Sequence, residues 1–250
     1  MARTWADYIN YDMEHGPFDV SQLSEFMRGL ADGGPTPSGH RTPAVIVTLP
    51  VTGADEQTFK ANAWMVSQVL ATGVHGILLC HAESPAAISA FVDSARYTFR
   101  GGRRGSGGQA RAAEIWGVSV PEYLEKADPW PLSANGELLL GLKVENTRAL
   151  ENAEKVTAVP GIAFAEWGPG DMGMSLGHPD AHDPPYPPDM QAARERVLKA
   201  CKASKLAFLE MVTPDNVLEQ LAAGVMIGAG KGAEQAAEIG RKHTGRTMPW

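Results

Sequence analysis

The chain has 250 residues, of which 44% are hydrophobic and 20% charged, and this composition is typical of one globular domain over residues 1–250. Its formal net charge of −7 argues against a nucleic-acid-binding surface. No apolar run is as long as a membrane span, no signal peptide is recognisable, and the two cysteines have neither a disulfide nor a zinc spacing. The expectation is a cytoplasmic enzyme that binds a small molecule and has no nucleic-acid or membrane partner.

Short apolar runs alternate with helical patterns along the whole chain. Strands are predicted over residues 8–12, 44–49, 76–81, 138–145, 162–167, 206–211 and 224–228. This alternation predicts an α/β fold of the TIM-barrel type, with its chemistry at the carboxyl ends of the strands. A closed (β/α)8 barrel has eight strands, so the seven predicted strands favour a barrel with one βα unit missing, and the alternative is a barrel that closes differently.

The first predicted strand is followed by a group of ionisable residues. Asp12, Glu14 and His15 stand at its carboxyl end, before Gly16 and Pro17. A histidine in this place suits a general base, because its ordinary pKa lies near neutral pH. The alternative is a histidine in a surface loop.

The region of residues 96–116 combines basic, glycine and aromatic residues. Arg100, Arg103 and Arg104 are interleaved with glycines, a pattern that fits either a mobile anion-binding loop or a solvated one. Trp116 follows and is a candidate for an aromatic wall of a substrate pocket.

Two acidic residues follow adjacent predicted strands in the centre of the chain. Lys143 and Glu145 alternate with Val144, so both polar side chains are expected on one face. The next strand ends in a turn, residues 168–170, that presents Asp171. Glu145 and Asp171 suit a hard divalent cation, whereas the alternative is a helix cap and a turn anchor.

The loop at residues 177–189 contains two histidines and three aspartates. His178, Asp180, His182 and Asp183 resemble metal ligands in type. The prolines among them predict an extended, exposed loop, and we do not expect a second metal site there.

Two stretches carry a resemblance to a known family. KVENTRALENAEKVTAVPGIAFAEWGPGDMGMSLGHP, residues 143–179, resembles the metal-binding signature of the HpcH/HpaI aldolase family, and YDMEHGPFD, residues 11–19, resembles its D-x-E-H-x-P-x-D motif. The resemblance implies that Glu145 and Asp171 hold Mg²⁺ or Mn²⁺, with Co²⁺ and Zn²⁺ as further options. It also implies that His15 assists proton transfer, that Gly170 contributes to substrate binding, and that the chain forms a homo-oligomer, a trimer or hexamer.

The chain departs from the family pattern at three places. Thr48 stands where the family usually has an arginine for the substrate's keto oxygen and carboxylate, so Arg96, Arg103 and Arg104 become candidates for that charge. Lys143 stands where the family tends to have a neutral residue, and we assign it as a second candidate cation for substrate. Family members also have a strand and a helix before the strand that ends in Glu-His.

The function implied by the resemblance is a metal-dependent carbon–carbon lyase. Its reaction would be retro-aldol cleavage, or aldol addition, on a hydroxylated 2-oxo acid or a related carbonyl compound. Two alternatives stay open: a Schiff-base aldolase that uses Lys143, and a non-catalytic ligand-binding barrel, which Thr48 and the missing unit would favour.

Overall fold

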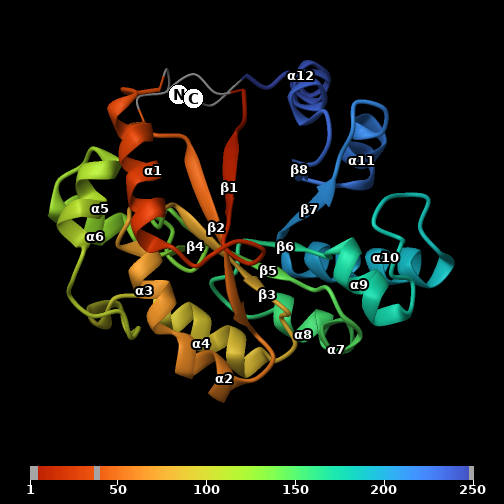
Figure 1. Ribbon diagram of the computed structural model, residues 1–250, viewed down its shortest axis with the longest axis horizontal. Helices are drawn as coiled ribbons and strands as arrows, with labels where there is room; N and C mark the ends of the chain where they lie inside the picture. The colour runs from red at the N-terminus through yellow and green to blue at the C-terminus, as the bar shows by residue number, and fades with distance from the viewer. Residues whose placement is uncertain (1–4, 37–39, 248–250) are drawn as a thin grey trace.

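The protein folds around one parallel β-sheet that curls into a partial barrel (Figure 1). The computed structural model describes residues 5–36 and 40–247. The strands are β1 (Tyr8–Asp12), β2 (Ala44–Thr52), β3 (Gly76–Cys80), β4 (Pro129–Trp130), β5 (Leu138–Lys143), β6 (Phe164–Glu166), β7 (Ala207–Met211) and β8 (Ile227–Ala229). Their order is β1-β2-β3-β5-β6-β7-β8, and the two-residue β4 pairs with β5. All seven predicted strands are therefore confirmed, and β4 was missed because it is so short.

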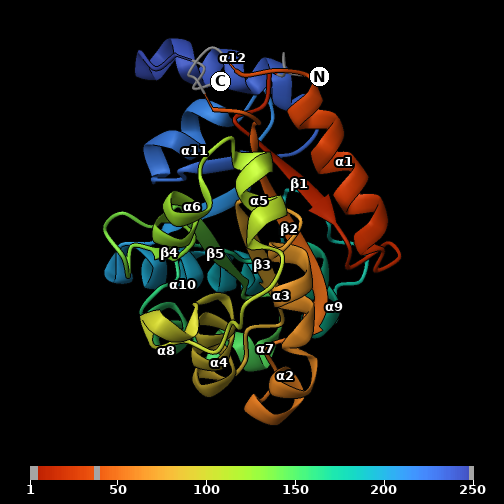
Figure 2. The same ribbon diagram turned by 90° about the vertical axis from the view of Figure 1, so that its left-hand side faces the viewer.

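Helices cover the outside of this sheet, as two perpendicular views show (Figures 1 and 2). They are α1 (Val20–Asp32), α2 (Glu56–Asn62), α3 (Trp64–Leu70), α4 (Pro85–Ala95), η1 (Thr98–Arg100), α5 (Gln109–Trp116), α6 (Val120–Lys126), α7 (Thr147–Glu151), α8 (Ala153–Thr157), α9 (Pro169–Leu176), α10 (Pro188–Ser204), α11 (Val217–Ala223) and α12 (Ala233–Thr244). Several begin at side chains that accept a backbone N–H, as Asp19, Ser84 and Asn146 do. Within the described ranges, no helix is long and apolar enough to cross a membrane.

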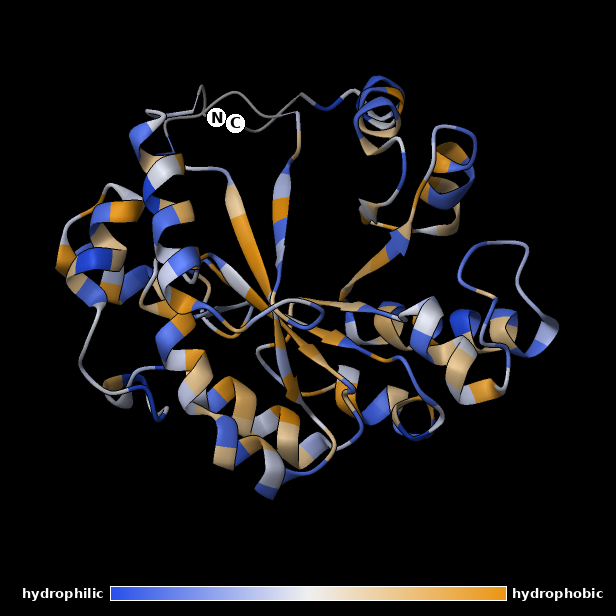
Figure 3. Ribbon diagram, in the orientation of Figure 1, coloured by the Kyte–Doolittle hydropathy of each residue, from blue (hydrophilic) through white to orange (hydrophobic). Residues whose placement is uncertain are grey.

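Successive side chains along each strand alternate between two apolar layers. Val45, Val47 and Leu49 of β2 face the helices and belong to the large core between sheet and helices. Ile46 faces the other way and packs inside the barrel with Leu78 and Phe164. Figure 3 shows the result, with apolar residues concentrated on the strands and on the sheet-facing sides of the helices. A side chain on the inner face of a strand end therefore points toward the barrel mouth.

The sheet does not close. Among the described residues, β1 pairs only with β2 and β8 pairs only with β7, so their outer edges face each other without pairing. A cavity of about 500 Å³ lies between them and is lined by β1, α11, β8 and α12. A (β/α)8 barrel that lacks one βα unit has this shape, as the strand count predicted.

Candidate active site

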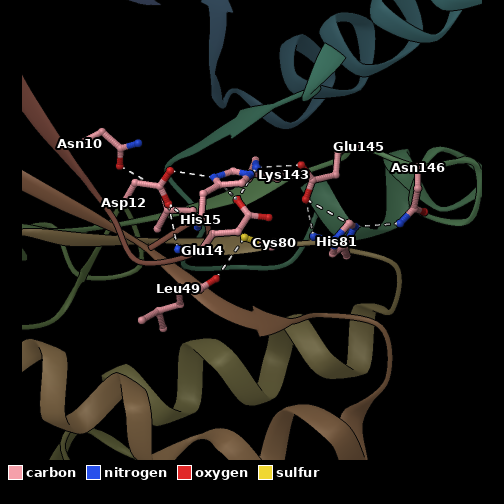
Figure 4. A network of polar contacts seen from close by, with 11 residues as sticks. Asn10, Asp12, Glu14, His15, Leu49, Cys80, His81, Lys143, Glu145 and Asn146 are labelled. Carbon is pink, nitrogen blue, oxygen red and sulfur yellow. Dashed lines mark hydrogen bonds and ion pairs between the residues drawn. The ribbon is translucent and has the colours of Figure 1, made fainter. Parts of the chain in front are cut away.

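A cluster of buried charges lies at the carboxyl end of the sheet (Figure 4). Lys143 is the last residue of β5, and its Nζ lies 2.7 Å from Glu14 Oε2 and 2.9 Å from Glu145 Oε2. The Glu145 side chain is fully buried, and Lys143 is 8% exposed. Burial by itself would lower the pKa of Lys143, but the neighbouring Glu145 and Glu14 carboxylates raise it well above its usual value. Lys143 is therefore an ammonium between two carboxylates.

The other oxygen of Glu145 is held by the chain after β3. His81 donates its backbone N–H to Glu145 Oε1 at 2.8 Å, and its ring Nδ1 lies 3.5 Å from the same oxygen. The His81 backbone has φ +46°, which is uncommon for a residue with a side chain and is found mostly where function requires it. Asn146 links His81 to Glu83, with distances of 3.2 Å and 2.8 Å from its Nδ2. These contacts fix the orientation of the Glu145 carboxylate.

Next to this cluster, the residues after β1 form an Asp–His pair. His15 Nδ1 lies 2.7 Å from Asp12 Oδ2, and Asp12 Oδ1 accepts the backbone N–H groups of Glu14 and His15. The hydrogen bond to Asp12 raises the pKa of His15. Burial would raise the pKa of Asp12, but the hydrogen bonds from His15 and Glu14 lower it overall. The carboxylate thus orients the imidazole and leaves Nε2 on the opposite side of the ring.

A glycine turn brings Asp171 to the same region. Gly168 has φ +54°, and a Cβ there would lie 2.5 Å from Glu145 Cβ, so only glycine lets the turn rest on Glu145. Pro169 begins α9, and Asp171 lies half-buried in its first turn. Gly170 approaches the loop after α9, where a Cβ would lie 3.0 Å from His182 Nδ1. The turn that carries Asp171 is therefore stacked on the fully buried Glu145.

The donor atoms of this region fit a hard divalent cation. Among the described residues, the groups of at least three potential ligands with atoms within 4.8 Å of one another are Asp12–Glu14–His15 and Glu14–Cys80–Glu145. Cys80 donates its thiol to Leu49 O, and burial raises its pKa, so it remains a thiol. Glu145 Oε2 is buried with the Lys143 ammonium as its close partner at 2.9 Å, and carboxylate oxygens are the ligands that Mg²⁺ and Mn²⁺ prefer. Asp171 is in neither group, although its turn contacts Glu145.

Comparison with known proteins places this site in a family. A model of the HpcH/HpaI aldolase/citrate lyase family matches residues 1–236. The chain belongs to this family. It is 28% identical over 208 residues to a hydroxypyruvate/pyruvate aldolase of Paraburkholderia phytofirmans, covering 83% of this chain and 70% of that protein. It is 29% identical over 208 residues to a 2-keto-3-deoxy-L-rhamnonate aldolase of Klebsiella pneumoniae, covering 83% and 67%.

Solved structures of the family have the same fold. An HpcH/HpaI aldolase/citrate lyase family protein from Burkholderia cenocepacia aligns with a TM-score of 0.71 and 24% identity, over 98% of this chain and 86% of that one. The resemblance recognised in the sequence is thereby confirmed. As a member of this aldolase family, the chain is an enzyme of the carbon–carbon lyase class.

Three residues assigned to substrate binding contact partners other than Glu14, Lys143 and Glu145, and a fourth is exposed. Thr48 points into the barrel, where its hydroxyl donates to Asn10 Oδ1 at 3.0 Å. Arg104 is 2% exposed, donates to the Tyr123 hydroxyl and lies 4.4 Å from the centre of the Tyr97 ring, whereas Arg103 is exposed. The indole of Trp116 donates to Gly73 O, and its ring stacks on His75. Arg104 and Trp116 thus belong to the packing around α5 and α6, outside the Glu14–Lys143–Glu145 cluster.

One further ionisable residue near the cluster was missed in the sequence. Glu166 is the last residue of β6 and pairs in register with Lys143. It shares the inner face of the sheet with Phe164, and burial raises its pKa to about 7. The alternation of Phe164, Ala165 and Glu166 was the signal that could have placed a carboxyl group inside the barrel.

Proposed function

We propose that this lyase is a metal-dependent aldolase that cleaves or forms a carbon–carbon bond in a hydroxylated 2-oxo acid. The observation that carries this proposal is the fully buried Glu145 carboxylate at the mouth of the barrel, beside the turn that bears Asp171. Glu14 and Glu145 share the single positive charge of Lys143, and a buried carboxylate whose charge is not fully compensated is costly in a fold unless a further cation uses it. The aldolases named above, which are similar over four fifths of this chain, support the substrate class.

In this proposal Glu145 and Asp171 hold a divalent metal, for which Mg²⁺ and Mn²⁺ are the first candidates and Co²⁺ and Zn²⁺ the next. A metal bound there supplies Lewis-acid stabilisation of the negative charge that develops on the substrate's keto oxygen. The contacts of Glu145 with His81 and of the Gly168 turn with Glu145 keep these two ligands in place before substrate arrives. Gly170, within this turn, gives the substrate close access to the backbone.

His15 acts as the base in the cleavage direction. Its Nε2 takes the proton from the hydroxyl group on the bond to be broken, the carbon–carbon bond breaks, and its electron pair moves to the keto oxygen. Asp12 holds Nδ1 at 2.7 Å and stabilises the imidazolium that forms. The His15 imidazolium then returns this proton to the enolate carbon that the cleavage leaves, which completes the 2-oxo acid, so no other reactant is needed.

Lys143 supplies the positive charge that Thr48 cannot. An ammonium at the barrel mouth can attract the carboxylate of a 2-oxo acid, and Glu14 keeps it in position. A Schiff-base mechanism is not favoured, because an amine nucleophile must be unprotonated and the two carboxylates raise the pKa of Lys143. A non-catalytic barrel is not favoured either, since it would not need the Asp12–His15 pair beside Glu145.

The cellular setting of the enzyme belongs to the same proposal. We infer a cytoplasmic homo-oligomer, a trimer or hexamer, whose partner is a small carbonyl compound. Light scattering on the purified protein measures the subunit number, and a mass equal to one chain would contradict the oligomer.

Release of pyruvate or aldehyde from a panel of 4-hydroxy-2-oxo acids tests the proposed function. We expect release that stops with EDTA and returns with Mg²⁺ or Mn²⁺. Release that EDTA does not affect would contradict the metal requirement and return attention to Lys143, which borohydride trapping with substrate would then examine. An absence of release from every compound would contradict the substrate class.

Replacement of His15 by glutamine is expected to lower kcat/KM by about 10²–10⁴-fold, the usual contribution of a general base. Because the neutral imidazole accepts the proton, kcat/KM of the unaltered enzyme should rise with pH through the pKa of His15, which the Asp12 hydrogen bond holds above 6.5. Asp12→Asn removes that carboxylate, so the rise should move to lower pH. If the unaltered enzyme and the Asp12→Asn variant had the same pH profile of kcat/KM, another group would be the base.

A further inference from the structure

The ammonium group of Lys143 occupies the place beside Glu145 where a metal ion would supply its charge. Its Nζ lies 2.9 Å from Glu145 Oε2 and 2.7 Å from Glu14 Oε2, and Figure 4 shows Lys143 between the residues of β1, β3 and β5. Glu145 Oε2 is thus both a candidate metal ligand and the partner of an internal cation, the Lys143 ammonium.

The two oxygens of Glu145 have different partners. Oε1 is held by the backbone N–H of His81, which cannot move without a change in the chain after β3. The close partner of Oε2 is the Lys143 ammonium, at 2.9 Å. A lysine has a flexible stem and a compact charge, so this partner can move. Oε2 is therefore the oxygen that a metal can reach, and the Lys143 ammonium occupies the position next to it.

The charges around Lys143 leave room for a second cation. Glu14 and Glu145 both contact the ammonium, and Glu166 stands beside it in register on β6. Cys80, the remaining potential ligand within reach of Glu14 and Glu145, stays a neutral thiol. One ammonium among several carboxyl groups leaves a local excess of negative charge. A divalent cation would relieve it only if the two cations do not share one oxygen, because like charges a few ångströms apart repel each other strongly in a buried site.

We propose that Lys143 is a built-in competitor of the divalent metal at Glu145 Oε2, and that metal binding moves its ammonium onto Glu14 alone. This inference rests on the proposed function, because it takes Glu145 as a metal ligand. It assigns Glu14 a role as the acceptor that holds Lys143 when the metal is present. The metal affinity then depends on how strongly Glu14, compared with Glu145, attracts the Lys143 ammonium. In the metal-loaded enzyme the ammonium is turned away from Glu145 and is available to an anionic substrate.

Binding of Mn²⁺ to the whole chain, followed by electron paramagnetic resonance and calorimetry without substrate, tests the inference. Lys143→Met is expected to bind Mn²⁺ about tenfold more tightly than the unaltered protein, because a competing unit charge has been removed. Lys143→Gln is a second variant that keeps a polar group if the methionine variant does not fold. Arg148→Met is the matched control: Arg148 is an exposed cation that pairs with Glu83 and has no contact with Glu145, so its loss should leave affinity unchanged.

Glu14 gives a prediction of opposite sign. Glu14→Gln should weaken Mn²⁺ binding, because Lys143 then has Glu145 as its one contacting carboxylate and neutralises it more fully. In a Lys143→Met background the same Glu14→Gln change should have no further effect. If Glu14 were itself a metal ligand, it would weaken binding in both backgrounds, and the proposed role of Glu14 would be overturned.

The outcomes separate this inference from the proposed function. Mn²⁺ binding that is equal or weaker in both Lys143 variants overturns the inference and leaves the metal-dependent aldolase standing. Binding to the Lys143 variants but not to the unaltered protein supports the inference and contradicts the metal requirement. An absence of binding to any of the proteins overturns both.

Discussion

Glu145→Gln is expected to lower kcat/KM on the order of 10³-fold or more, at least the loss that follows removal of one group that stabilises a developing oxyanion. The substitution keeps the shape of the side chain and its contact with the His81 N–H, but it removes the negative charge that Lys143 contacts and that the proposed divalent cation would use. The variant should therefore lose metal affinity together with activity. Steady-state kinetics at saturating Mg²⁺, combined with calorimetric titration of the metal, measures both effects.

Two variants make this result specific. Asp171→Asn should give a loss of similar size, because Asp171 is the second proposed metal ligand and its turn rests on Glu145 at Gly168. Glu122→Gln changes an exposed carboxylate on α6 that pairs with Lys126, so its effect on kcat should be less than about tenfold. A Glu145→Gln variant that is folded, active and saturated by metal would disprove the assignment of Glu145.

The sequence contained the fold and the likeness to the family because both depend on local patterns. Buried parallel strands appear as short apolar runs, and helix starts appear as Asp19, Ser84 and Asn146 at positions where a side chain can accept a backbone N–H. The Gly-Pro-Gly-Asp turn is visible in the same way, since Gly168 needs a positive φ and close approach to a neighbour.

The arrangement of charges could not be read from the sequence, because it depends on pairs of distant residues. Glu14 and Lys143 are 129 positions apart and meet because β1 and β5 end at the same mouth of the barrel. No local pattern says which carboxylates a lysine will find there. The alternation around Lys143 correctly put it on the face of Glu145, but its contact with Glu14, which also raises its pKa, follows only from the fold.

Arg104 shows that the composition of a segment can mislead about the burial of a single side chain. Its glycine-rich surroundings are typical of an exposed loop, yet the guanidinium is buried between Tyr97 and Tyr123. Arginine tolerates this place because its flat, weakly hydrated group stacks on aromatic rings. Composition describes the average solvation of a segment, and a single side chain within it can turn inward when aromatic rings, here those of Tyr97 and Tyr123, provide a surface.

A second large effect is expected on stability, at Glu210 on β7. Its Oε1 accepts the Trp167 indole N–H at 3.0 Å and the Met211 backbone N–H at 2.8 Å, and its Oε2 accepts from Arg194 of α10. The carboxylate is 2% exposed. Glu210→Ala would leave the buried Arg194 charge without its carboxylate, and breaking such a pair costs about 3–5 kcal/mol. For a chain of this size the melting temperature should fall by roughly 6–20 °C, which circular dichroism measures directly.

So large a loss of stability is expected because the Glu210–Arg194 pair is buried. The Glu154–Arg196 pair is a matched control that isolates the effect of burial. Glu154 forms the same kind of contact with Arg196, at 2.9 Å, but both side chains are largely exposed, so Glu154→Ala should cost less than about 1 kcal/mol. Glu210→Met combined with Arg194→Met should cost less than the sum of the single changes, because removing both charges leaves neither buried alone.

Since Trp167 directly precedes Gly168, a shift of the indole in Glu210→Ala should also loosen the turn that presents Asp171, and lower metal affinity would accompany the lost stability. Equal melting temperatures for the Glu210 and Glu154 variants would show that the buried carboxylate is not what fixes this side of the barrel.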